Sequence, residues 1–488
     1  MSPPPSSSLS GNASSVVKKA MQGALALGLR QIAVQVVNLA GGILLARLLT
    51  PAQFGVFGIV TFVLSFLGTL GDVGLGASLV RDAHEPTDHD YRVVFTAQQL
   101  LVSSVVLLLW IAAPFVAEAY HLPDSARWLF RGVGLSLFAS SFQTVPAIRL
   151  ERHLAFDRLA IVEVTQTLVY NGLAVGLAWS GFGAASFVLA ILARSITGAV
   201  VVQFVSRWRF GWQWDYPNVK RHLAFGLPYQ GIGVVSLIKD SITPILVGVL
   251  AGTAVVGYIN WAQMVAAYAV MALMIFQRIY LPMFARLQSE PKALGAVVER
   301  VVWATNAISA PLAVLTLVLF DPFTTIVFGS KWLVARNLFR LLWVANLFVP
   351  TSTPLLGLLS ALGHSRMSFL FAVIWMLGTW AVGAPLIFMY GGIGFAIANV
   401  VVQFSNIALT YVAKSKVPFS VLKTIARAWA VAVAVGAATY FVEQRFPVEH
   451  LSSLVAYITG GVALYLGGLV VVDGQAIKDA RALASNAP

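Results

Sequence analysis

The sequence predicts an all-α, polytopic membrane protein with about fourteen transmembrane helices. Of its 488 residues, 58% are hydrophobic and only 10% are charged, whereas a soluble domain carries about 25% charged residues. The apolar residues gather into successive long runs, and an α-helix needs about 20 such residues to cross a bilayer. Because fourteen helices of this length leave only short connections, we expect no large soluble domain.

Fourteen apolar runs, taken in order, form two sets of six and a final pair. The runs are separated by short connections, as at residues 50–53, 180–183 and 251–253, where proline, glycine and small polar residues favour turns. The first set lies near residues 22–49, 54–80, 93–117, 128–149, 159–179 and 184–206. The second set lies near residues 223–250, 254–281, 296–320, 337–360, 367–390 and 392–412. The final pair lies near residues 421–441 and 450–472.

These runs predict two six-helix lobes followed by two further helices. The N-terminal tail is rich in proline and serine, a composition that is typical of disorder. The predicted segments, in order, are a disordered cytoplasmic tail at 1–21, an N-terminal lobe at 22–206, a cytoplasmic linker at 207–222, a C-terminal lobe at 223–412, the last two spans within 413–472 and a cytoplasmic tail at 473–488.

A weak internal repeat supports the two lobes. Residues 52–56 (AQFGV) resemble residues 254–258 (AVVGY), and residues 183–185 resemble residues 394–396 at a similar offset. Because six is an even number of spans, such lobes would be parallel repeats, related by an axis along the membrane normal.

The distribution of basic residues predicts the orientation in the membrane. Cytoplasmic loops retain lysine and arginine. With the N-terminus in the cytoplasm, the inner segments and span ends hold twenty-two of the 32 lysines and arginines, and the outer ones hold seven. Both termini are therefore expected in the cytoplasm. The net charge of +13 is explained by these inner loops, so we expect no binding to nucleic acid.

The chain lacks the residue patterns of several enzyme and metal sites. It has no cysteine, which excludes disulfides, iron–sulfur clusters and thiolate zinc sites. It has no GxxxxGK[ST] loop and no serine-nucleophile elbow, and its histidines lie in loops or at span ends without metal-ligand spacing. The longest predicted outer loop, at 321–336, is short for a catalytic loop. We therefore expect a protein that is not an enzyme and that holds neither a metal nor an organic cofactor.

Ionisable residues inside the predicted spans are the first candidates for a site. A charge at the bilayer centre costs about 2.5–3.5 kcal/mol on insertion scales, so it pairs or faces a wet cavity. Arg30 and Asp72 lie at similar depths from the inner ends of their spans. They form either a structural salt bridge or an anion-binding arginine that Asp72 holds in place. The ionisable residues in question are Arg30, Asp72, Glu163, Arg194, Lys239 and Asp240.

The seventh span carries two of these residues side by side. Lys239 and Asp240 lie near its middle, and adjacent side chains on a helix project about 100° apart, so we expect that they do not face each other. Pro228 and Pro244 bracket this stretch. Proline frees backbone carbonyls, which a membrane tolerates where the helix lines a cavity. We expect a bending helix on which Lys239 binds an anionic substrate and Asp240 carries a proton or a sodium ion.

Amide side chains recur along several spans. Gln35 and Asn38 lie in the first span, Gln263 lies in the eighth, and Arg194 lies near the middle of the sixth. Such groups either join helices by hydrogen bonds or line a polar passage. Because amides are many and acids are few, the pattern favours a sugar-lined passage over a cation pump. The predicted binding residues are therefore Gln35, Asn38, Gln263 and Arg194, together with Arg30 and Lys239.

Two motifs near the start of the chain match a known family pattern. They are LARLLTPAQFG at residues 45–55 and GDVGLG at residues 71–76. Through them the chain resembles the polysaccharide exporter branch, with its Wzx-type and colanic-acid-exporter-like proteins, of the multidrug/oligosaccharidyl-lipid/polysaccharide (MOP) flippase superfamily. The resemblance extends over roughly residues 20–415 and includes AFDRL at 155–159, GYINWA at 257–262, PMFARLQ at 282–288 and FGSKW at 328–332.

The resemblance implies a MATE-like, two-lobed transporter. Such proteins move undecaprenyl-pyrophosphate-linked oligosaccharides across the bacterial inner membrane by alternating access, for export of exopolysaccharide, capsule or O-antigen. Implied partners are the lipid-linked oligosaccharide, membrane lipids and pathway proteins such as a polysaccharide polymerase. Related peptidoglycan-precursor flippases have basic cavity residues in the first span, where Arg30 stands here. The alternatives left open are a cation-coupled drug antiporter of the same superfamily, a peptidoglycan-precursor flippase and, from another class, a glycan polymerase or ligase.

Overall fold

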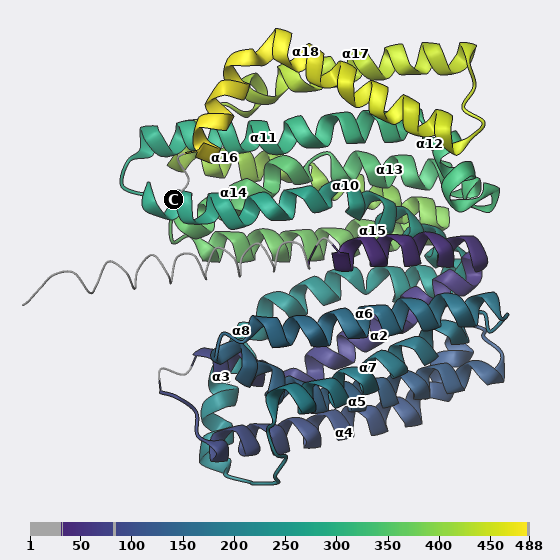
Figure 1. The fold of residues 1–488 in the computed structure, drawn as a ribbon, viewed down its shortest axis with the longest axis vertical. Coiled ribbons are helices and arrows are strands. Elements are labelled where there is room, and N and C mark those ends of the chain that lie inside the picture. Colours follow the sequence, from purple (N-terminus) through teal and green to yellow (C-terminus); the bar gives the residue numbers. More distant parts are fainter. Residues whose placement is uncertain (1–30, 32, 82–83, 486–488) are drawn as a thin grey trace, which may run out of the picture. The chain divides into compact units, whose positions relative to one another are not determined.

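The computed structural model describes residue 31, residues 33–81 and residues 84–485, and these are mostly helical (Figure 1). No β-strand occurs in those ranges. Ten helical segments within them are long and apolar enough to cross a membrane, which confirms the all-α membrane fold. The predicted disordered tail at 1–21 lies outside the described residues, and the total of fourteen crossings stays a prediction.

The chain divides into two compact units. Among the described residues, unit 1 holds those up to residue 49 and those between 60 and 233, and unit 2 holds residues 50–59 and those from 234 onwards. Two helices, α2 (Pro51–Asp72) and α8 (Tyr216–Asp240), therefore begin in one unit and end in the other. The sequence placed a linker between the lobes at 207–222, and in the structure residues 216–222 of that segment form the first turns of α8. The lobes as moving bodies stay a prediction.

Unit 1 is built from long helices in which α5 packs against α4 and α7, and α6 packs against α7. Local sequence explains where α4 begins. The Thr87 hydroxyl accepts a hydrogen bond from the Asp90 N–H, and the Asp90 carboxylate accepts one from the Thr87 N–H, which is a capping box. The helices of unit 1, besides its parts of α2 and α8, are Ala33–Leu48, α3 (Leu75–Arg81), α4 (Asp88–Ala119), a 3-10 turn at Asp124–Ala126, α5 (Arg127–Arg152), α6 (Phe156–Trp179) and α7 (Ala185–Ser206).

Unit 2 is organised around α11, which packs against α10, α14, α17 and α18. Short π-helical and 3-10 segments connect several of its helices. In order, its elements are a π-helical segment at Thr243–Val247, α9 (Gly248–Ala251), α10 (Thr253–Arg286), α11 (Pro291–Val318), α12 (Phe320–Phe323), a π-helical segment at Thr324–Phe328, a 3-10 segment at Ser330–Ala335, α13 (Arg336–Asn346), α14 (Val349–Ala361), α15 (Ser365–Gln403), α16 (Asn406–Lys416), α17 (Val421–Arg445) and α18 (Leu451–Ser485).

One span that the sequence predicts as continuous, at 54–80, is broken in the structure. Val73 and Gly74 have φ angles of 40° and 74°, so the chain leaves α2 and starts again as α3. An ideal Cβ on Gly74 would lie 2.4 Å from the carbonyl oxygen of Gly226. Glycine is therefore required at this position both for its backbone conformation and for the close approach of α8.

The two segments of the internal repeat contact each other in unit 2. An ideal Cβ on Gly55 of α2 would lie 1.7 Å from the Thr253 carbonyl oxygen. One on Gly257 of α10 would lie 1.9 Å from the Pro51 carbonyl oxygen. The contact is reciprocal, because each helix places its glycine against the first turn of the other. Segments related by a two-fold axis make contacts of this kind.

An aromatic cluster made of Phe54, Tyr258, Trp261, Phe328 and Trp332 joins three of the motifs that carry the family resemblance. Trp261 stacks on Trp332 with a centroid distance of 5.1 Å. Phe54 and Tyr258 meet Trp332 edge-on at 5.4 and 6.0 Å. Both tryptophans are fully buried. The predicted outer loop is thus a set of short helical turns that are anchored in the core of unit 2.

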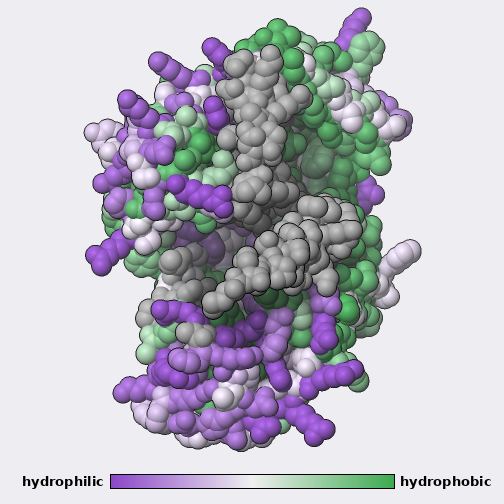
Figure 2. All heavy atoms as spheres, turned by 60° about the vertical axis from the view of Figure 1, so that its left-hand side comes forward, coloured by the Kyte–Doolittle hydropathy of each residue, from purple (hydrophilic) through white to green (hydrophobic). Residues whose placement is uncertain are grey.

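Apolar side chains are exposed along the flanks of both units, as Figure 2 shows for one face. In the same view, hydrophilic side chains gather over the ends of the helices. Phe204 of α7 is 79% exposed and Val471 of α18 is 85% exposed. Large apolar side chains in such numbers are expected to contact lipid in a membrane protein.

Candidate functional site

A row of amide side chains begins between the first described helix and α6 in unit 1. The Nδ2 of Asn171 donates to Oδ1 of Asn38 and to the carbonyl oxygen of Thr167, both at 2.9 Å. The two helices approach each other closely at Gly41: an ideal Cβ on this residue would lie 1.8 Å from Oδ1 of Asn171. The predicted binding residue Asn38 therefore joins two helices, and Gln35, about one turn away, is half-buried.

A second amide pair continues this row. The Nε2 of Gln166 on α6 donates to Oε1 of Gln143 on α5 at 2.7 Å, and to the backbone carbonyl of Arg194 on α7 at 3.4 Å. One amide thus connects three helices. The sequence did not single out Gln143, although its position inside a predicted span was the signal that would have found it.

Arg194, a predicted binding residue, presents an exposed guanidinium on α7. Its Cζ lies 5.9 Å from the ring centroid of Tyr170 on α6, within the range of a cation–π contact. No carboxylate partner for Arg194 is found in the part of the chain that the structure describes. The guanidinium is therefore available to an anion.

Asp72 ends α2 and is held by an amide of α8. The Nε2 of Gln230 donates to Oδ2 of Asp72 at 3.0 Å. This hydrogen bond joins two helices of unit 1 beside the break between α2 and α3. The predicted partner, Arg30, lies outside the described residues, so the choice between a salt bridge and an anion site stays open.

The prediction that Lys239 and Asp240 do not face each other is wrong. The Nζ of Lys239 forms an ion pair with Oδ1 of Asp240. The regular helix ends at Asp240, and the backbone continues through a turn into the π-helical segment at Thr243–Val247. The lysine stem can therefore fold back towards its neighbour. The break lies beside Pro244, which lacks a backbone donor, and the Asp240 side chain remains 60% exposed.

Side chains satisfy the backbone carbonyl of Ile238 close to this break. The Ser241 hydroxyl donates to it at 2.7 Å, and Nε1 of Trp380 on α15 also donates to it at 2.7 Å. Side-chain donors thus compensate for the interrupted helix, as interrupted membrane helices require. They also attach the end of α8 to α15 within unit 2.

Gln263, the remaining predicted binding residue, is exposed on α10. Asn260, about one turn before Gln263, instead packs against α2. An ideal Cβ on Gly58 of α2 would lie only 1.5 Å from Nδ2 of Asn260. Of these two amides, Asn260 fills a helix–helix contact, and Gln263 is the one that a ligand can reach.

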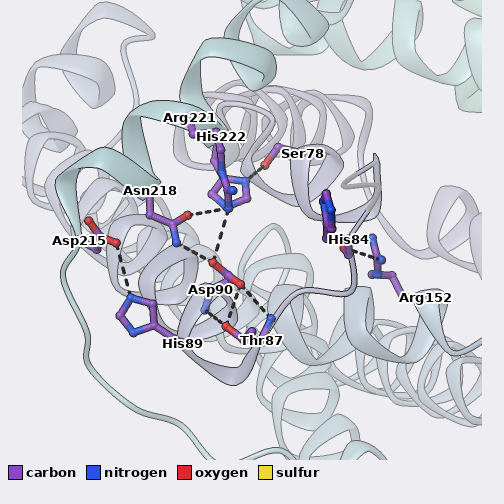
Figure 3. A network of polar contacts seen from close by, with 10 residues as sticks. All are labelled: Ser78, His84, Thr87, His89, Asp90, Arg152, Asp215, Asn218, Arg221 and His222. Atoms are coloured by element: carbon purple, nitrogen blue, oxygen red, sulfur yellow. Dashed lines mark hydrogen bonds and ion pairs between the residues drawn. The ribbon is translucent and has the colours of Figure 1, made fainter.

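A polar network at one end of unit 1 holds the first half of α8 (Figure 3). Asp90 on α4 accepts a hydrogen bond from Nδ2 of Asn218 at 2.6 Å and lies 3.5 Å from Nη2 of Arg221. One residue further along α8, the buried His222 shares a hydrogen bond with the Ser78 hydroxyl of α3, with Nδ1 and Oγ 2.8 Å apart. The first two turns of α8 are therefore fixed to α3 and α4.

The same network secures the neighbouring connections. The Nε2 of His89 lies 3.6 Å from Oδ2 of Asp215 in the segment before α8. Arg152, at the end of α5, donates to the carbonyl oxygens of Leu79 and His84 at 2.6 and 3.2 Å. Among the described residues, no group of three or more His, Asp or Glu side chains is arranged to hold a metal ion. The hydrogen bonds of the network position α3, α4, α5 and α8.

Unit 2 contains an apolar cavity of about 680 Å³. It lies between α14, α16 and α17 and is lined by Phe348, Phe404, Leu422, Ile425 and Trp429, among other side chains. Leu422 is 76% exposed and Phe404 is 55% exposed, so the apolar lining continues onto the flank of the unit. A cavity of this composition suits a hydrocarbon chain.

The sequence is similar to those of polysaccharide biosynthesis proteins. The profile of a family described as "Polysaccharide biosynthesis protein" matches residues 44–337. The chain is 22% identical over 373 residues to the lipopolysaccharide biosynthesis protein WzxC of Escherichia coli (strain K12), with 75% of each chain covered. It is 21% identical over 358 residues to the teichuronic acid biosynthesis protein TuaB of Bacillus subtilis (strain 168), which covers 73% of this chain and 74% of that one.

The fold is similar to that of a solved membrane transporter. The lipid II flippase MurJ, in its inward closed conformation, superimposes with a TM-score of 0.78 at 15% sequence identity, covering 93% of this chain and 100% of that chain. At this level of identity the similarity shows the fold alone. Together with the apolar helices, it makes the chain a multi-pass membrane protein.

Proposed function

Because the chain belongs to the polysaccharide biosynthesis protein family of MOP-superfamily exporters, we propose that it is a flippase for a lipid-linked oligosaccharide. The substrate is an undecaprenyl-pyrophosphate-linked repeat unit. The protein moves its head group across the bacterial inner membrane, and the repeat units are then assembled into an exported polysaccharide.

The observation that carries this proposal is the position of Arg194 beside the amide row of unit 1. Arg194 lies near the middle of an apolar helix, exposed and without a carboxylate partner among the described residues. A cation in that position costs too much to face lipid, so it faces a wet cavity. Its fork of N–H donors matches a phosphate. The nearby amides supply the donors and acceptors that sugar hydroxyls need.

The apolar cavity of unit 2 supports a substrate that carries a lipid. A soluble drug would leave this surface to the bilayer, whereas a prenyl chain can occupy it while the head group crosses. The cavity has a volume of about 680 Å³ and is open along an apolar flank. These properties of the cavity favour a substrate with a hydrocarbon part.

The helix α8, which begins in unit 1 and ends in unit 2, supports alternating access as the mechanism. The polar network of Figure 3 fixes the first half of α8 in unit 1, and the Trp380 hydrogen bond fixes its end in unit 2. Gly231 and Gly233 lie between these attachments, and an ideal Cβ on Gly231 meets no atom within 4 Å. The middle of α8 is therefore the part that is free to bend when one unit moves against the other.

We assign ion coupling to Asp240. Asp240→Asn is expected to leave the protein level unchanged and to alter how polymer export responds to loss of the proton or sodium gradient, because the variant cannot carry the ion. Lys239→Ala keeps the carboxylate and is expected to lower export under all conditions. Export is measured as polymer per cell with a protonophore or in sodium-free medium. A wild-type response from both variants would overturn the coupling assignment.

The predicted orientation is tested by labelling single cysteines. The chain has no native cysteine, and Ser330 and Ser415 are both exposed. A membrane-impermeant thiol reagent on intact spheroplasts is expected to label Ser330→Cys and to spare Ser415→Cys, and both are expected to react after lysis. The opposite pattern would reverse the orientation and, with it, the direction of transport.

A deletion strain distinguishes the flippase from its alternatives. The proposal predicts that lipid-linked repeat units accumulate in the cytoplasmic leaflet and that the polymer is lost. Repeat units that reach the outer leaflet and stay unpolymerised would identify a polymerase or ligase. Normal polymer with altered drug tolerance would identify an antiporter. Growth arrest with accumulated peptidoglycan precursor would identify a peptidoglycan-precursor flippase.

A further inference from the structure

A second cavity of unit 2 differs in character from the apolar one. It has a volume of about 430 Å³ and lies where α11 and α17 begin and where α18 is broken at Asp473, whose φ and ψ are −138° and 33°. We term it the basic cavity. Its charged lining residues are Glu299, Arg300, Lys423, Arg427 and Asp473.

Both carboxylates of the basic cavity are already engaged. Asp473, whose side chain is only 8% exposed, accepts hydrogen bonds from Nε1 of Trp303 at 2.7 Å and from Nη1 of Arg427 at 3.2 Å. Glu299 accepts one from the backbone N–H of Ser420 at 2.7 Å. These contacts hold the three helices together, and the two acids balance two of the three cations that line the cavity.

The cations of the basic cavity are in excess. Arg300 and Lys423 make no ion pair or hydrogen bond with any residue that the structure describes. Arg427 is 65% exposed and has donors to spare, because a guanidinium carries five N–H groups. The first turn of α17, which has no side-chain cap, adds the positive end of its helix dipole. The cavity therefore offers several convergent donors and net positive charge.

We propose that the basic cavity binds a phosphate group, carried by the head group of an anionic membrane lipid or by a soluble phosphate. Its depth suits a lipid, because the apolar spans of α17 and α18 begin and end at the level of the cavity, where lipid phosphates lie. Basic pockets between membrane helices bind anionic head groups in this way. The inference does not depend on which substrate the protein transports.

The test compares lipid binding by the full-length protein with that of a charge-depleted variant. Arg300→Gln with Lys423→Gln removes both cations that have no partner among the described residues, while Arg427, which holds the buried Asp473, is kept. Arg366→Gln, on an exposed residue in the first turn of α15, is the matched control. Binding of phosphatidylglycerol and of phosphatidylcholine to the purified proteins is measured by native mass spectrometry and by thermal shift.

The wild type and the Arg366→Gln control are expected to prefer phosphatidylglycerol, and the double variant is expected to bind it at least about fivefold more weakly. Inorganic phosphate and pyrophosphate form the second arm. Stabilisation of the wild type by these anions, lost in the double variant, would assign the site to a soluble phosphate. If the double variant does not fold, Lys423→Gln alone is measured. The proposal is overturned if the charge-depleted variant binds both lipids and both anions as the wild type does.

Discussion

Gly55→Ala is expected to lower the melting temperature of the purified protein sharply and to reduce the amount that inserts in the membrane. The new methyl group would lie 1.7 Å from the Thr253 carbonyl oxygen, and because that atom belongs to the backbone it cannot turn aside. The helices α2 and α10 must separate instead. Overpacking of this kind costs about 1–3 kcal/mol, occasionally more, and here it disturbs the neighbouring aromatic cluster.

Gly172→Ala is the matched control for this change. Gly172 also lies within a helix, but an ideal Cβ there meets no atom within 4 Å, so the substitution is expected to be neutral or slightly stabilising. Gly257→Ala disturbs the same contact from the other side, and the double variant is expected to lose less than the sum of the single losses. Equal melting temperatures for Gly55→Ala and Gly172→Ala would disprove the close contact.

Arg194→Gln is expected to reduce polymer export about ten- to a hundredfold at a normal level of folded protein. The estimate follows from the roughly 1.5–3 kcal/mol that a hydrogen bond to a charged group contributes. Arg194→Lys keeps the charge but loses the planar fork, so an intermediate loss is expected. Export is measured as polymer per cell, and protein level by immunoblot of membranes.

Two further variants separate binding from general charge effects at Arg194. Arg366→Gln removes a cation from an exposed helix end that has no place in the proposed site and is expected to leave export unchanged. Tyr170→Ala removes the ring beside Arg194 and is expected to weaken export less than Arg194→Gln does. Normal export by Arg194→Gln would remove Arg194 from the translocation path.

The sequence predicted the fold well, because the apolar runs and their turn residues directly encode the helices. The predicted boundary between the spans at 367–390 and 392–412 coincides with Gly391, whose φ is 57°. The break between α2 and α3 was missed, because it depends on the close approach of a distant helix at Gly226. Hydropathy identifies the segments that can cross a membrane but carries no information on contacts between distant helices.

The candidate site was only partly predictable. The amides of the spans could be identified from the sequence, but their hydrogen-bonded partners could not, since Asn38 and Asn171 are far apart in the chain. The Lys239–Asp240 ion pair was excluded on regular helix geometry, which does not apply where the helix ends. Asp473, an acid of the basic cavity, accepts a hydrogen bond from Trp303, which is 170 residues away in the chain. No sequence pattern connects two residues at that separation.

Translocation by the purified protein in vesicles tests the central claim most directly. The protein is reconstituted into liposomes that contain a labelled undecaprenyl-pyrophosphate-linked oligosaccharide in both leaflets, and a membrane-impermeant glycosidase is added outside. We predict that nearly all of the label becomes accessible in wild-type vesicles, and only the outer half in protein-free vesicles and in vesicles with Arg194→Gln. A protected inner half in wild-type vesicles, in the presence of the required ion gradient, would contradict the account.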